Sequence, residues 1–265
     1  MKKWMKFILW LFFVSGVIVI LIIVKQKEGE SLLESPTVHI HVQGQDSFLN
    51  ENEVLNRLKT HQLFGDRKKV SDLDVFKVEA IFDTMPEVRN VEVFKSLKGS
   101  WTIDLELIRP IARVFPDNEK SYYLDSDGNK MQRSSIHTAR TLIFSGSIPD
   151  KFDGENLSSI INNDSLKSIR LLDDIYRISN YVCKDPLLLS LIGQVYLDRD
   201  QDFILIPVVG KHKIIFGKAS TVKEVADKFH RLKVFYKEAL PFEGWNKYTE
   251  IILKYEGQVV CRKVK

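Results

Sequence analysis

The sequence is poor in cysteine and lacks the short motifs that mark common enzyme active sites. Its two cysteines, Cys183 and Cys261, have no Cys-x-x-Cys spacing and lie far apart, so they indicate neither a zinc site nor a disulfide. The sequence contains no Walker loop, no Gly-x-Gly-x-x-Gly and no His-Glu-x-x-His. Its six histidines form no recognisable frame with a serine or cysteine. We therefore expect no cofactor, no metal site and no catalytic residue.

A strong excess of one charge is also missing. The 39 basic residues are nearly balanced by 35 acidic ones, which gives a formal net charge of +4. The basic residues are spread along the chain and do not alternate with aromatic residues, so the pattern does not favour nucleic-acid binding. With 265 residues and 44% hydrophobic content, the chain is long enough for one or two packed domains.

Two short patterns resemble parts of metal sites. His39 and His41 lie two residues apart, on one face of a predicted strand, but no third ligand is recognisable nearby. Asp125-x-Asp127-Gly128 resembles the start of a calcium loop, but the later acidic positions of that motif are missing. A solvated strand face and an ordinary turn are the favoured interpretations.

Two further patterns have simple structural interpretations. Ser220-x-x-Lys223 matches one motif of the penicillin-recognising enzymes, but the companion motifs are absent. Ser220 also stands where a helix cap is expected. Asp173 and Asp174 are expected on the exposed side of a helix, as solvated charges.

One long hydrophobic run stands at the start of the chain. The 7–24 segment, Phe7 to Val24, contains no charged residue and spans about 27 Å as a helix, close to the thickness of a bilayer's hydrocarbon core. Charged residues follow it where a signal peptide would have its cleavage site, so we expect an uncleaved transmembrane helix. Lysines at positions 2, 3 and 6 predict a cytoplasmic tail at 1–6. The polar residues 25–35 then form a linker to domains outside the cytoplasm.

Residues 36–109 are predicted to form an α+β module with two helices on one face of a sheet. The expected elements are a strand at 37–44, a helix capped by Asn50, a helix at 71–85 capped by Ser71 or Asp72, and strands at 88–97 and 101–108 joined around Lys98-Gly99. The last strand alternates clearly between apolar and polar residues. We expect its core-facing residues to be Trp101, Ile103, Leu105 and Leu107, and its outward residues to be Thr102, Asp104 and Glu106.

Residues 110–265 are predicted to form a larger mixed α/β domain with an antiparallel sheet. Its expected elements are a hairpin at 122–131, a strand at 141–148, a helix at 165–182, strands within 193–207 and 212–217, a helix after Thr221 with Glu224 in a capping box, and a closing hairpin.

The closing hairpin raises the question of what covers its last strand. Tyr255 ends a β-like run, Glu256-Gly257 has the form of a two-residue loop, and residues 258–264 return as a strand. We expect this strand to leave its outer backbone groups unpaired, and such an edge can accept a partner strand. The alternative is an ordinary core hairpin whose edge is covered by another loop. A proline at Val260 would test this expectation if the N–H of Val260 faces outward.

Several of these patterns together resemble the FtsQ/DivIB family of bacterial cell-division proteins. Residues 73–114 are similar to the family's POTRA module, and Arg109-Pro110-Ile111-Ala112 resembles its junction with the next domain. Residues 122–131 are similar to the family's Leu-x-Asp-x-x-Gly hairpin. Residues 250–262 are similar to its closing hairpin, in which Ile252 replaces a residue that is often Asp or Asn in the family.

The resemblance implies a non-enzymatic divisome scaffold in the cell inner membrane at the division septum. It would bind FtsL- and FtsB/DivIC-type coiled-coil partners by strand addition at the closing hairpin, and through them the septal peptidoglycan synthase. No small-molecule substrate is implied. An anchored envelope-assembly or export factor that uses its POTRA module as a strand chaperone is the alternative, and a cell-wall enzyme is a third. The expected partner-binding residues are Tyr248, Leu253, Tyr255, Val259, Val260 and Arg262.

Overall fold

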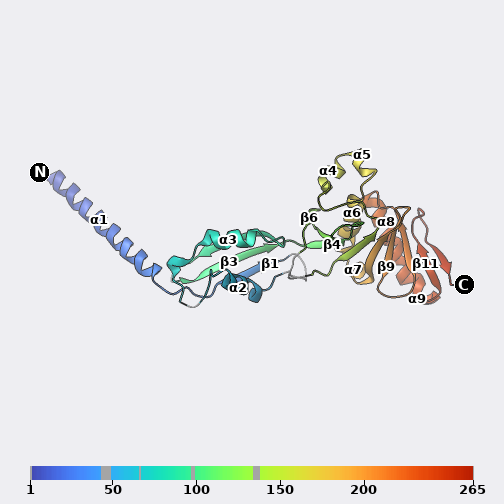
Figure 1. Ribbon diagram of the computed structural model, residues 1–265, viewed down its shortest axis with the longest axis horizontal. Coiled ribbons are helices and arrows are strands. Elements are labelled where there is room, and N and C mark those ends of the chain that lie inside the picture. The colour runs from blue at the N-terminus through green and yellow to red at the C-terminus, as the bar shows by residue number, and fades with distance from the viewer. Residues whose placement is uncertain (1, 43–48, 66, 97–98, 134–137, 265) are drawn as a thin grey trace. The chain divides into compact units, whose positions relative to one another are not determined.

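The chain folds into two compact units that differ in size and in sheet topology (Figure 1). The computed structural model describes residues 2–42, 49–65, 67–96, 99–133 and 138–264. Unit 1 comprises Met1–Leu107 and unit 2 comprises Ile108–Lys265. Both units combine helices with a sheet, which confirms the α+β class. Three parts of the predicted elements lie outside the described residues: positions 43–44 of the first strand, Leu97 of the strand at 88–97, and Lys98 of the hairpin loop.

The chain begins with one long helix, α1, which comprises Lys2–Gly29. Within it, Phe7–Lys27 is long and apolar enough to cross a membrane, and none of this stretch is buried against the rest of the protein. This helix fits a single-pass membrane anchor. It continues past the predicted span and so includes the first part of the predicted linker.

Unit 1 contains a three-stranded sheet with two helices packed on it. Its elements are β1 (Thr37–His41), α2 (Glu51–Thr60), a short 3₁₀ turn η1 (Val70–Asp72), α3 (Val75–Asp83), β2 (Val88–Lys95) and β3 (Trp101–Leu107). The strand order is β1-β3-β2, with β1 parallel and β2 antiparallel to the central β3. This arrangement confirms the predicted order of strands and helices in this part of the chain.

The core of unit 1 forms between β3 and the two helices. Side chains alternate along β3 as the sequence predicts, and the core-facing ones are at most 3% exposed: Trp101, Ile103, Leu105 and Leu107. They pack with Val54 and Leu58 of α2 and with Val78 and Phe82 of α3. The predicted cap of α3 is wrong. Ser71 and Asp72 both lie within η1, and the side chain of Asp74 accepts the N–H of Lys77 instead.

Unit 2 is built on a nine-stranded mixed sheet. Its strands are β4 (Pro110–Val114), β5 (Tyr122–Asp125), β6 (Lys130–Met131), β7 (Leu142–Gly146), β8 (Ile192–Leu197), β9 (Phe203–Pro207), β10 (Lys213–Gly217), β11 (Tyr248–Ile252) and β12 (Val260–Lys263). The spatial order is β12-β11-β10-β9-β8-β7-β4-β5-β6. Because three neighbouring pairs are parallel (β4 with β7, β7 with β8, and β10 with β11), the prediction of an antiparallel sheet is only partly right.

Helices pack on this sheet and complete one large core. They are α4 (Leu157–Ile161), α5 (Asp164–Lys167), α6 (Leu172–Val182), α7 (Pro186–Leu191), α8 (Val222–Val234), a π-helical turn η3 (Phe235–Ala239) and α9 (Leu240–Glu243). Apolar residues of α6 and α8 join those of the central strands in one buried cluster. The single helix predicted at 165–182 is therefore two helices, α5 and α6, with a break between them.

The predicted exposure of Asp173 and Asp174 is also wrong. Both residues lie in the first turn of α6 and are at most 8% exposed. The Arg177 guanidinium pairs with both carboxylates, at 2.9 Å from Asp173, and its Nε donates to the carbonyl of Ala219 at 2.6 Å. Burial raises the pKa of Asp174, which the nearby Arg177 partly offsets. These charges therefore fasten α6 to the chain before α8 instead of facing solvent.

Candidate partner-binding site

The last strand, β12, forms the edge of the nine-stranded sheet. It pairs antiparallel with β11, in the register Glu250 with Arg262, Ile251 with Cys261 and Ile252 with Val260. Among the described residues no strand lies on its other side. The long edge of β12 is thus open to a further strand, as the sequence predicts.

The connection between β11 and β12 is longer than predicted. β11 ends at Ile252 and β12 begins at Val260, so seven residues, 253–259, form the loop. Gly257 has a positive φ of 69°, a conformation that glycine adopts without strain. The expected two-residue loop at Glu256-Gly257 is therefore wrong, although the turn does contain these residues.

Arg231 of α8 donates hydrogen bonds to the backbone of this loop. Its Nη1 donates to the carbonyls of Tyr255, at 2.8 Å, and of Gln258, and its Nη2 donates to the carbonyl of Leu253 at 3.1 Å. One guanidinium thus satisfies three backbone acceptors of an irregular segment, a geometry suited to its fixed fork of donors. Arg231 carries no distinguishing signal in the sequence, because it is one of several charged residues on the polar side of an amphipathic helix.

Two hydrogen bonds show which backbone groups of β12 face outward. The N–H of Val264 donates to Lys247 at 3.0 Å, and the hydroxyl of Thr249 donates to the carbonyl of Arg262 at 3.2 Å, so both residues turn their backbone toward β11. Backbone groups alternate in direction along an antiparallel strand. Cys261 and Lys263 therefore present their N–H and C=O groups to the open side of the sheet. The backbone N–H and C=O of Val260 instead face β11.

The six predicted partner-binding residues occupy different environments in this hairpin. Tyr255, Val260 and Arg262 are exposed, and Val259 and Tyr248 are partly buried against the core. The Tyr248 ring lies 6.1 Å from that of Phe235, and its hydroxyl donates to Glu243 at 3.1 Å. Leu253 is fully buried, so its side chain supports the hairpin from inside and offers no surface to a partner.

Charge on the hairpin is arranged in local pairs. Arg262 lies opposite Glu250 and pairs with it at 3.1 Å, on the same side as the exposed Val260. Lys254, at the start of the loop, pairs with Asp202 at 3.2 Å, and this partner raises the pKa of Lys254. The exposed side of the hairpin therefore combines the apolar side chain of Val260 with the guanidinium of Arg262, whose side chain is 68% exposed.

The short patterns that resemble a calcium loop and an enzyme motif have structural roles. The buried Asp125 carboxylate accepts the N–H groups of Asp127 and Asn129 and so organises the turn between β5 and β6. Thr221 caps α8, and Ser220 donates its backbone N–H to Glu224 at 3.1 Å. The part of the chain that the structure describes contains no cluster of three or more His, Cys, Asp or Glu in a metal-binding arrangement.

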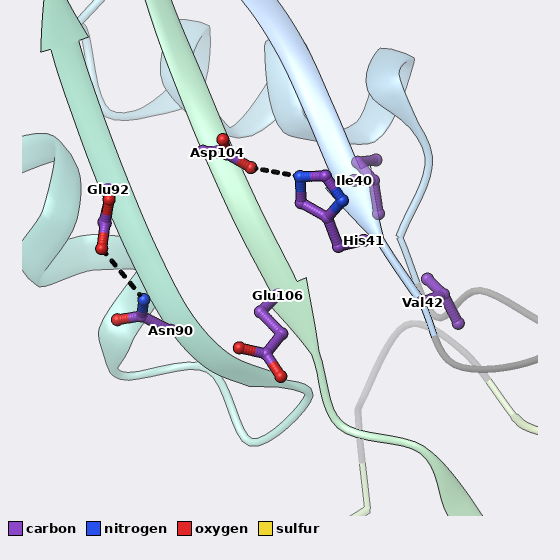
Figure 2. A pocket seen from close by; sticks show the side chains of 7 residues that line it. All are labelled: Ile40, His41, Val42, Asn90, Glu92, Asp104 and Glu106. Carbon is purple, nitrogen blue, oxygen red and sulfur yellow. Dashed lines mark hydrogen bonds and ion pairs between the residues drawn. The ribbon is translucent and has the colours of Figure 1, made fainter.

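The two histidines of β1 lie on the outer face of the unit 1 sheet. Nε2 of His41 lies 2.6 Å from Asp104 Oδ1, and Asn90 donates to Glu92 across the same face (Figure 2). Figure 2 shows these side chains and that of Glu106 on neighbouring strands. They line an open hollow of about 590 Å³. His41 and Asp104 form a surface pair, which agrees with the solvated strand face that the sequence favoured.

Both cysteines are free in the structure. Cys183 ends α6, and its Sγ lies 3.4 Å from the carbonyl of Asn180, while Cys261 lies in β12 with its side chain against the core. Burial raises the pKa of both thiols. Neither thiol is therefore activated as a nucleophile at neutral pH.

Fold and site together define a class of protein with an apolar N-terminal helix, a small βααββ unit and a large sheet that ends in an open strand. The sequence model of the family FtsQ/DivIB, C-terminal related, matches residues 109–262, which is more than half of the chain. The chain belongs to this family, as the sequence patterns suggested, and its family places it among cell-division proteins. No curated protein matches the chain.

Proposed function

We propose that this protein is a non-enzymatic scaffold of the division machinery that binds its partners by strand addition at β12. The observation that carries the proposal is the open edge of β12, at the end of the domain that matches the family. A partner strand would bond to the outward backbone groups of Cys261 and Lys263, and the exposed Val260 and Arg262 would add side-chain contacts.

The partners in this proposal are the FtsL- and FtsB/DivIC-type coiled-coil proteins, and through them the septal peptidoglycan synthase. Family membership supports division-complex partners in general. The lysines at positions 2, 3 and 6 support an N-terminus in the cytoplasm, which would place both units outside it at the division septum of the cell inner membrane. Residues 36–109 would act as a POTRA module.

The proposal is tested by co-purification from membranes that contain the FtsL- and FtsB-type proteins of the same cell. We expect the intact chain to retain both partners. A chain truncated before Gln258 should lose them while its circular dichroism remains that of a folded protein. Partner retention by the folded truncated chain would contradict strand addition at β12.

Depletion of the protein in cells tests the wider role. A division scaffold predicts filamentous cells with unfinished septa. Normal septation combined with defects in outer-membrane proteins would instead support the envelope-assembly alternative that the βααββ order of unit 1 also suggests.

A further inference from the structure

The position at which α1 ends can be compared with the hydrocarbon core and the headgroup layer of a bilayer. The uncharged run ends at Val24, and α1 continues for five more residues to Gly29. At 1.5 Å per residue these add about 7.5 Å beyond the hydrocarbon core. The headgroup layer on each side of the core is roughly 5–8 Å thick. The helix therefore ends near the outer limit of the headgroup layer.

The part of unit 1 that contains its sheet follows immediately at this height. The carbonyl of Ser31 accepts the N–H of Val70 at 3.0 Å, and the N–H of Leu33 donates to Lys68 at 2.8 Å. Leu33 itself is buried in the core of unit 1. The segment after α1 is thus bonded to residues 68–70 and adds no free length of chain between the helix and the sheet of unit 1.

The end of α1 and the η1 turn also lie against each other. They line one hollow of about 540 Å³, and the lining residues are Ile22, Lys25, Gln26, Gly29, Glu30, Lys69 and Ser71. Lys69 and Ser71 are therefore beside the last turns of the helix and share its depth relative to the bilayer.

The residues gathered at this end combine positive charge with one exposed apolar side chain. The basic residues are Lys25, Lys27, Arg67, Lys68 and Lys69, and Leu32 is 65% exposed. Of the nearby acidic residues with described side chains, Asp72 accepts the N–H of Lys69 at 3.1 Å and the hydroxyl of Ser71 at 3.2 Å, and Glu30 and Glu34 are exposed. The surface is therefore suited to anionic headgroups, with an apolar side chain at interface depth.

We propose that this membrane-proximal end of unit 1, formed by Lys25, Lys27, Leu32, Arg67, Lys68 and Lys69, binds the headgroups of anionic phospholipids. The contact holds unit 1 against the membrane surface and fixes the height of β1 and β3 above it. The proposal rests on the membrane anchor of the proposed function, but it does not depend on which side of the membrane carries unit 1.

The test uses the full chain in nanodiscs of phosphatidylcholine, with or without a quarter of phosphatidylglycerol. A Cys183→Ser, Cys261→Ser background carries one fluorophore on Ser71→Cys, and in a second sample on Asn90→Cys. Asn90 pairs with Glu106, which lies five residues along β3 from Trp101, the end that adjoins Gly99, so Asn90 lies about 17 Å from that end. Quenching by headgroup spin-labelled lipid is measured at both positions.

We expect strong quenching at Ser71, more with phosphatidylglycerol than without it, and little quenching at Asn90. Lys68→Glu combined with Lys69→Glu should reduce the Ser71 quenching at least twofold in the anionic nanodiscs. The matched control, Lys120→Glu combined with Lys211→Glu, makes the same charge change at exposed positions of unit 2 and should leave the quenching unchanged.

Equal quenching at Ser71 and Asn90, or quenching insensitive to both lipid charge and the Lys68 and Lys69 reversal, would overturn the proposal. A label on Gly16→Cys with acyl-chain spin-labelled lipid separates this failure from failure of the anchor. Gly16 has no neighbouring side chain within 4 Å to perturb. If the Gly16 label is quenched and the Ser71 label is not, the anchor stands and only the headgroup contact fails. If the Gly16 label is not quenched, both the anchor and the contact are wrong.

Discussion

The central strand of unit 1 and the edge strand of unit 2 show two different uses of a β-strand. β3 has a strand on each side, and its core-facing residues are at most 3% exposed. Among the described residues, β12 has one strand beside it, and its Val260 is 38% exposed. The first strand is committed to stability. The second leaves backbone groups that are free for a partner, so substitutions in the two strands should affect different measurements.

The largest effect on stability is expected in β3. Leu105→Ala removes a fully buried side chain and should lower the free energy of unfolding by about 2–5 kcal/mol. Asp104→Ala, on the opposite face, breaks only a surface pair with His41 and should cost less than about 1 kcal/mol. Denaturant unfolding of the detergent-solubilised chain measures both. Equal costs would show that the register of β3 is wrong.

A smaller effect is expected where α8 supports the hairpin. Arg231→Ala leaves the carbonyls of Leu253, Tyr255 and Gln258 without their shared donor and should cost about 1–2 kcal/mol, since the group is only partly buried. Amide hydrogen exchange should become faster in residues 253–258 and remain unchanged in β3. Arg231→Lys should restore little, because an ammonium group lacks the planar fork of donors. Unchanged exchange in the loop would contradict the role of Arg231.

The pH dependence of stability should also distinguish unit 2 from unit 1. His212 is 2% exposed and its Nε2 lies 2.5 Å from the Tyr236 hydroxyl; burial lowers its pKa from the usual 6.5. As pH falls below 6.5, the unfolded chain therefore binds a proton that the folded chain does not, and unit 2 loses stability. Thermal unfolding at pH 7.5 and 5.5 measures this loss. His212→Gln should reduce it, and an equal loss in the variant would exclude His212 as the cause.

The smallest stability effect is expected at the outer side of β12. Arg262→Glu replaces an exposed ion pair with two like charges and should cost less than about 1 kcal/mol. It should still weaken the binding of an acidic partner segment. The double variant Arg262→Glu, Glu250→Arg restores the cross-strand pair and serves as the control. If the double variant recovers stability but not binding, the loss of binding is due to the charge on β12. If both variants bind as well as the original protein, the charge of Arg262 has no role in binding.

The comparison also explains what the sequence could predict. Strict alternation from Trp101 to Leu107 identified the buried face of β3, because a strand with one face in a core shows a period of two. The open edge at β12 was also expected, but the outward groups were not identifiable. They depend on the pairing with β11, which shows that the N–H of Val260 points inward, so Val260→Pro would disturb the hairpin itself.

Errors arose where contacts distant in sequence decide the structure. Asp173 and Asp174 have the polarity of surface residues, and only the position of Arg177 and of the Ala219 carbonyl makes their burial possible. The loop at 253–259 contains Glu256-Gly257, which favours a tight turn, but the three bonds to Arg231 hold a wider one. Local propensity gave way to tertiary contacts in both places.

Two variants at Lys263 distinguish strand addition at β12 from binding elsewhere on the protein. Lys263 is exposed, and its N–H faces the open side of the sheet, so Lys263→Pro removes a donor that only a partner strand would use. Lys263→Ala removes the same side chain and keeps the donor. If a partner strand adds to β12, we expect both variants to fold with nearly unchanged stability and only the proline variant to lose the FtsL- and FtsB-type partners. Equal binding by the two folded variants would contradict strand addition at β12.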